Sequence, residues 1–269
     1  MHSARPSLSV AIVAMLGSLP FHGCVGRTGG DAITFAVAAA GPVDATFGQP
    51  LAWTANGFDV VLTEARLHVG ALYLAEASPV SGAQATGCYL TGTYVAEETA
   101  SLDVGLLSAE PQPFPQAARG VTEPAALVGQ VWLTGGDINQ AADPTAILVV
   151  TGSATKADSS FPFHGTVTIS TNRAPAGGGA SAGSAICKQR IVTPISVSLI
   201  LDGTGELLLR IDPRLFFTGV DFSQLPPDDA GGYAFGDDPS AAGYAPTGQT
   251  LYSNLRSTAP YDFTWTEAP

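Results

Sequence analysis

The stretch Leu51-Ala-Trp-Thr-Ala-Asn-Gly-Phe-Asp-Val-Val-Leu62 decides the fold class. Its first five and last five residues are short apolar runs that contain aromatic and β-branched side chains, which favour strands. Asn56-Gly57 stands between them and is a preferred sequence for a two-residue hairpin turn, because both residues tolerate a positive φ. The stretch therefore predicts two antiparallel strands over residues 51–55 and 58–62.

Similar apolar runs, most of them alternating with period two, continue along most of the chain and predict about ten further strands. A hairpin through Asp202–Glu206 is expected to join two of them, and Gly70 is expected to mark a bulge in another. Two stretches without this rhythm, Arg173–Ala185 and Asp221–Gln249, are expected to be long loops. The expected strands are Ile33–Val37, Arg66–Leu74, Tyr94–Val95, Ser101–Leu107, Gln130–Leu133, Ala146–Val150, Phe163–Ser170, Ile195–Leu201, Leu207–Ile211 and Tyr261–Trp265.

The composition agrees with an all-β protein. The 269 residues include 31 glycines and 20 prolines, which suit many short strands joined by turns. No linker separates two self-sufficient sets of strands. We therefore expect residues 32–269 to form one antiparallel β-sandwich with Greek-key-like connections. The 23 acidic against 11 basic residues exclude a nucleic-acid partner, because phosphate binding needs a basic surface.

The first 23 residues are typical of a signal peptide. Arg5 precedes the apolar run Leu8–Leu16, which is too short to span a bilayer as a permanent helix. The segment Leu19–Cys24 resembles the lipobox of bacterial lipoproteins, with Gly23 before Cys24. This resemblance implies that Cys24 is acylated, that residues 24–31 are a lipidated tether, and that the protein is sorted to the outer membrane. An ordinary signal peptide followed by an unmodified cysteine is the alternative.

The cysteine count fits an exported protein. The chain has three cysteines, and acylation of Cys24 leaves Cys88 and Cys187. Cysteines of exported proteins meet an oxidising compartment, where thiols pair. We therefore predict one disulfide between Cys88 and Cys187.

Only two histidines, His68 and His164, remain after removal of residues 1–23. Both fall in predicted strands, and two strand histidines that meet at one sheet edge would bind copper or zinc. The alternative is two unrelated histidines, each with a local hydrogen bond. A second candidate site is calcium bound by loop carboxylates, against the alternative of solvated charges; its residues are Asp228, Asp229, Asp237 and Asp238.

No catalytic residues are assigned from the sequence. The chain has no G-x-S-x-G elbow, no H-E-x-x-H zinc motif and no G-x-x-x-x-G-K-[ST] phosphate loop. Neighbouring carboxylates on a strand point to opposite faces, so the acidic pairs do not form a glycosidase site.

Two segments resemble known exported proteins. Asn56–Leu74 and Leu209–Phe222 resemble segments of exported bacterial lipoproteins of unassigned role. More distantly, both resemble the β-sandwich proteins associated with methanobactin and the surface copper-binding proteins of methane oxidisers. That resemblance implies a copper-handling surface protein in which His68 and His164 are the imidazoles.

The sequence therefore predicts a lipid-anchored, non-enzymatic binding or structural module at the outer membrane. A copper or other transition-metal binder of the same architecture is the first alternative. A secreted hydrolase with an atypical site is the second alternative.

Overall fold

The computed structural model describes residues 30–76, 94–122, 126–134, 143–169, 191–201, 205–235 and 246–266. Several residues with predicted roles lie outside these ranges, so those roles stay predictions; they are Cys24, Cys88, Cys187, Asp237 and Asp238. The predicted signal peptide also lies outside them.

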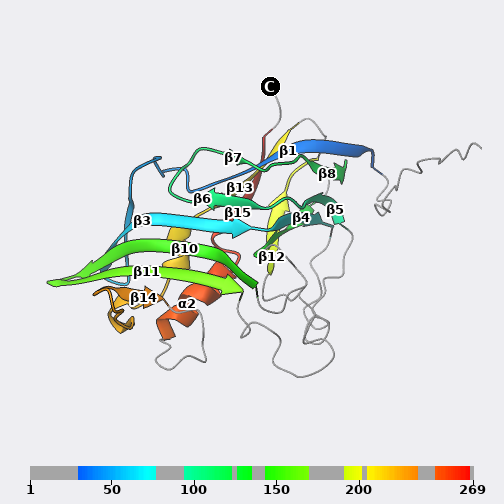
Figure 1. Ribbon diagram of the computed structural model, residues 1–269. Helices are drawn as coiled ribbons and strands as arrows, with labels where there is room; N and C mark the ends of the chain where they lie inside the picture. Colours follow the sequence, from blue (N-terminus) through cyan, green and yellow to red (C-terminus); the bar gives the residue numbers. More distant parts are fainter. Residues whose placement is uncertain are drawn as a thin grey trace, which may run out of the picture.

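The described strands form two sheets (Figure 1). The larger has nine strands, and its short strand β7 (Gln112–Pro113) pairs with β1 off the main path. In spatial order its other strands are β12 (Ile191–Ser198), β9 (Ala126–Trp132), β4 (Ala71–Ala75), β5 (Tyr94–Glu98), β8 (Ala118–Val121), β1 (Ala32–Ala40), β13 (Glu206–Ile211) and β15 (Tyr261–Thr266).

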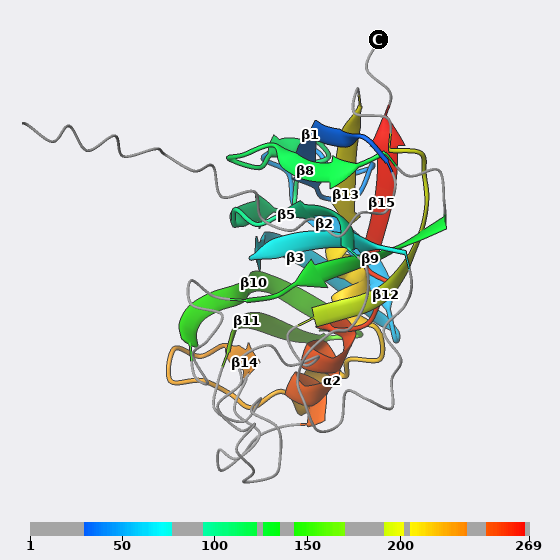
Figure 2. The same cartoon turned by 90° about the vertical axis from the view of Figure 1, so that its right-hand side faces the viewer.

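The smaller sheet has six strands, and β6 (Leu102–Gly105) pairs with one part of β3 while β2 pairs with another. Its order is β14 (Tyr233–Phe235), β11 (Ser159–Ile169), β10 (Asp143–Lys156), β3 (Phe58–Val69) and β2 (Leu51–Ala55). The helical elements within the described residues are η4 (Pro213–Phe217), η5 (Phe222–Gln224) and α2 (Pro246–Leu255), and α2 lies beside β14 in both views (Figures 1 and 2).

The predicted all-β sandwich is confirmed, and most strand pairs are antiparallel. Among the described strands, two pairs are parallel, β1 with β13 and β11 with β14. A short turn forces neighbouring strands to be antiparallel, whereas these partners are far apart in the sequence and free of that constraint. The sheets are therefore mixed.

The hairpin that decides the fold class is present. β2 pairs with β3 from Ala55↔Phe58 to Leu51↔Leu62, as the sequence predicts. Asn56 has φ 53° and Gly57 has φ 76°, the two positive values that a type I′ turn requires. The turn is also tied to the rest of the domain, because Asn56 Nδ2 donates to the carbonyl oxygen of Val220 at 3.0 Å.

Gly70 divides the predicted strand Arg66–Leu74 between the two sheets. β3 ends at Val69 in the smaller sheet, and β4 begins at Ala71 in the larger one. A Cβ atom at Gly70 would collide with Thr134 Oγ1, so only glycine fits where the chain changes sheets. The residue expected to mark a bulge is therefore the crossing point.

Two other expectations are wrong. The predicted hairpin between 195–201 and 207–211 does not form, because β12 pairs with β9 while β13 pairs with β1 and β15. The region Asp221–Gln249, expected to be a loop, contains η5, β14 and the start of α2. The apolar face of α2 consists mainly of Leu251 and Leu255. Two apolar residues at a spacing of four are too few to reveal a helix in the sequence.

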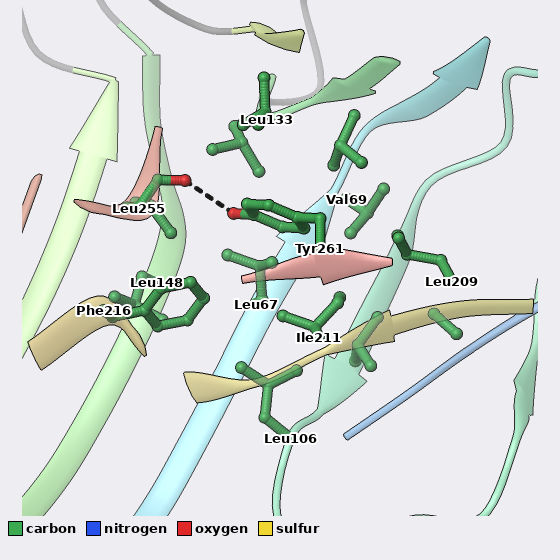
Figure 3. Packing of buried hydrophobic residues seen from close by; sticks show 14 of the residues in the cluster. Leu67, Val69, Leu106, Leu133, Leu148, Leu209, Ile211, Phe216, Leu255 and Tyr261 are labelled. Atoms are coloured by element: carbon green, nitrogen blue, oxygen red, sulfur yellow. Dashed lines mark hydrogen bonds between the residues drawn. The ribbon is translucent and has the colours of Figure 1, made fainter. Parts of the chain in front are cut away.

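The core fills the space between the sheets and is closed at one end by η4, η5 and α2. Phe217 and Phe222 stack with ring centroids 5.9 Å apart, and Phe163 packs against both. Tyr261 lies in this core and donates its hydroxyl to the carbonyl oxygen of Leu255 at 2.8 Å (Figure 3). Within the part of the chain that the structure describes, no helix has the length and hydropathy needed to span a bilayer.

Candidate functional site

His68 lies near the end of β3, on the face of the smaller sheet opposite the core. Leu67 and Val69 on either side of it are fully buried in the core, so alternation turns His68 outward together with Arg66. The register of β3 with β6 places Asp103 directly opposite His68. Side chains opposite each other in a sheet lie on the same face, which brings the carboxylate to the imidazole.

The hydrogen bonds of this pair leave one imidazole nitrogen free. His68 Nδ1 lies 2.8 Å from Asp103 Oδ1, and Arg66 Nη1 donates to Asp103 Oδ2 at 3.2 Å. His68 Nε2 is buried and has no hydrogen-bond partner among the described residues. In the neutral ring with the proton on Nδ1, Nε2 carries a lone pair. Asp103 thus selects the tautomer that presents Nε2 as a ligand atom.

His164 lies on the same outer face, on β11, in a different environment. Its side chain is 53% exposed, against 13% for His68, and its Nδ1 is 3.3 Å from Asp228 Oδ2. Asp228 Oδ1 accepts the backbone N–H groups of Ala230 and Gly232 at 2.7 and 2.8 Å. The Gly232 hydrogen bond is the main reason that the pKa of Asp228 is lowered, so this carboxylate stays ionised beside His164.

The two histidines do not meet at one sheet edge. His164 lies opposite Thr151 on β10, and Thr151 lies opposite Glu64, four residues before His68 on β3. Two strand spacings and four residues of strand separate the two Cα atoms by roughly 16 Å. A metal ion shared by both imidazoles is therefore excluded by the strand register. Among the described residues there is also no group of three or more His, Cys, Asp or Glu side chains that could hold a metal ion.

The predicted calcium residues are described only in part. Both oxygens of Asp228 are engaged by the backbone and by His164, and Asp229 is exposed. Asp237 and Asp238 lie outside the described residues, so the calcium site stays a prediction.

Sequence reasoning missed Asp103 and Glu98. Asp103 is 35 residues from His68, and only the β3–β6 register brings them together. Glu98 stands in an acidic pair with Glu97, which suggests two solvated charges, yet the residue is only 3% exposed. No signal in the sequence distinguishes Glu98 from its exposed neighbour, because β5 is too short to show which face is buried.

Comparison with known proteins gives one distant structural likeness. No protein-family model matches the chain, and no protein of curated function matches it. The chain is similar to the solved structure of MbnP from Methylosinus trichosporium, with 15% sequence identity and a TM-score of 0.38. The match covers 88% of this chain and 99% of that chain.

Proposed function

We propose that this protein is a non-enzymatic binding module of the cell envelope that binds a transition metal ion, with His68 Nε2 as the imidazole ligand. One observation supports the proposal: Nδ1 is held by Asp103, while the buried Nε2 has no partner among the described residues. A buried nitrogen without a partner costs free energy in the empty protein. A bound metal ion would satisfy that nitrogen.

The chemistry of the pair favours borderline metals. Neutral imidazole binds copper and zinc well, and a carboxylate that accepts the other N–H fixes the orientation of the ring. Copper is proposed first because an imidazole site follows the usual affinity order, in which copper exceeds zinc. Protonation of the ring removes the lone pair, so acid should weaken binding. Anchoring by a lipid at Cys24 in the outer membrane completes the proposal and rests on the sequence alone.

Calorimetric titration of copper(II) and zinc into the mature chain at neutral pH tests the site. His68→Ala should abolish binding, and Asp103→Asn should weaken it about 10–100-fold, as loss of an orienting carboxylate does in other sites. His164→Ala is the matched control, since this exposed imidazole belongs to a separate pair and its removal should leave the isotherm unchanged. Equal isotherms for wild type and His68→Ala would overturn the proposal.

The two other functions predicted from the sequence can be tested separately. A surface module that binds no metal is favoured by the exposed apolar side chains of Val43 and Phe47, which are 75% and 76% accessible. Absence of metal binding in wild type would favour that reading. A hydrolase with an atypical site stays a prediction, and turnover of any compound in a panel of ester, peptide and glycoside substrates would support it.

A further inference from the structure

Glu98 is a carboxyl group buried between the two sheets. It ends β5, and the register places it opposite Leu72, whose side chain lies in the core. Opposite residues share a face, so Glu98 points inward, while Glu97 points to the outer face. Oε1 of Glu98 accepts the backbone N–H of Ala100 at 2.7 Å.

The surroundings of Glu98 disfavour its ionised form. It borders a small cavity whose other inward-facing residues come from five strands and are all apolar; they are Phe35, Val37, Leu72, Leu74, Ala96, Ala118 and Leu207. Among the described residues, the other ionisable side chains that line this cavity are Glu97 and Tyr73, and none of the lining side chains is cationic. Arg119, from β8, pairs in register with Glu97 on the outer face. A carboxylate in such a place loses hydration and gains no positive partner.

The pKa of Glu98 agrees with this geometry. Burial raises it above the ordinary value for a glutamate, the Ala100 N–H opposes the rise, and the charge of Glu97 adds to it. A raised pKa in the folded state means that the neutral form of Glu98 stabilises the folded structure around it. That stability is fully present below the pKa of the solvated carboxyl and decreases as the pH rises through the folded-state pKa.

The segment that follows Glu98 leads directly to the candidate metal site. Ala100 and Ser101 connect β5 to β6, and Asp103 on β6 holds the imidazole of His68. Because Glu98 binds the backbone of Ala100, the same carboxyl group fixes the corner between the two sheets. Movement at residues 98–102 would displace Asp103 relative to β3.

We propose that Glu98 is a proton-operated latch: its neutral form holds the β5–β6 corner closed, and its ionisation loosens the segment that positions Asp103 against His68. The effect on a bound metal rests on the proposed function, whereas the latch itself does not. In this arrangement, a rise in pH through the folded-state pKa of Glu98 loosens the corner from inside the core.

Hydrogen exchange of the mature chain between pH 4.5 and 8, corrected for the intrinsic pH dependence of exchange, measures the opening of residues 96–105. In wild type the opening equilibrium should increase with pH, by up to tenfold per pH unit between the solvated and folded-state pKa values of the carboxyl group. Glu98→Gln keeps an acceptor for Ala100 and cannot ionise, so its opening should be independent of pH. Glu97→Gln, the matched control on the exposed face, should retain most of the wild-type slope.

The latch would be overturned if the opening equilibrium of residues 96–105 did not change with pH in wild type. It would also be overturned if Glu98→Gln showed the same dependence on pH as wild type. Titration of copper(II) and zinc at pH 8 tests the coupling separately. Glu98→Gln should bind metal more tightly than wild type there, because its side chain cannot ionise; equal affinities of the two proteins would remove the coupling. If neither protein bound metal but hydrogen exchange of residues 96–105 in wild type still depended on pH, the proposed function would be overturned and the latch would be supported.

Discussion

The guanidinium group of Arg214 binds Asp44 through both terminal nitrogens, at 2.7 and 3.1 Å. Its Nε and Nη2 atoms also bind Asp212, the residue that caps η4. Asp44 lies in the loop after β1, 170 residues away in the sequence. This pair fastens that loop, with the exposed side chains of Val43 and Phe47, to the short helix η4.

The Asp44–Arg214 pair should make stability depend on pH. The hydrogen bonds from Arg214 are the main reason that the pKa of Asp44 is lowered from its ordinary value of 3.8. A lowered pKa in the folded state gives stability that is present above 3.8 and is lost as the pH falls below it. Asp44→Asn should therefore reduce the loss of unfolding free energy between pH 5 and pH 2.5, measured by urea denaturation. The effect should be small, because the carboxylate is 56% exposed and solvent screens it.

Asp262→Asn, which removes an exposed carboxylate from β15, is the control for Asp44→Asn. A pH profile of Asp44→Asn identical to that of wild type would show that the ion pair contributes nothing to stability.

Tyr261→Phe should destabilise the domain by about 1–3 kcal/mol, the range for leaving a buried acceptor without its donor. The lost hydroxyl donates to Leu255 at the end of α2, whereas the ring contact with Phe216 is retained (Figure 3). Urea denaturation at neutral pH gives the difference. An unchanged midpoint would mean that water reaches the Leu255 carbonyl in the variant.

The predicted disulfide can be tested by thiol titration. Closing a loop of about 100 residues between Cys88 and Cys187 would restrict the unfolded chain by about 4–5 kcal/mol in the chain-entropy model. Denatured, unreduced mature protein should show no reactive thiol from either residue, and reduction should release two. Two reactive thiols before reduction would contradict the prediction.

The predicted lipid anchor depends on Cys24. Cys24→Ser should release the protein from the membrane fraction of the producing cell without changing its unfolding midpoint, because residues 24–31 precede β1 and are expected to be a tether. Incorporation of labelled fatty acid into wild type alone would be the positive result. Equal membrane retention of both proteins, with no incorporated label, would contradict acylation.

Local sequence patterns determined much of the fold. Asn56-Gly57 and the runs on both sides specified the β2–β3 hairpin, because a type I′ turn depends only on residues at the turn. Alternation likewise identified β1 and β15. The partners of β12 and β13 were assigned wrongly, since apolar alternation shows which face of a strand is buried and carries no information about which strand lies beside it.

The sequence by itself determined the all-β class and the two candidate imidazoles, His68 and His164. Only the tertiary structure decided that they lie in separate pairs, with Asp103 and Asp228. It also decided that Glu98 is buried and Glu97 is exposed. These relationships depend on which distant strands become neighbours when both sheets bury their apolar faces together. That outcome is set by the packing of the whole core, and no short segment contains it.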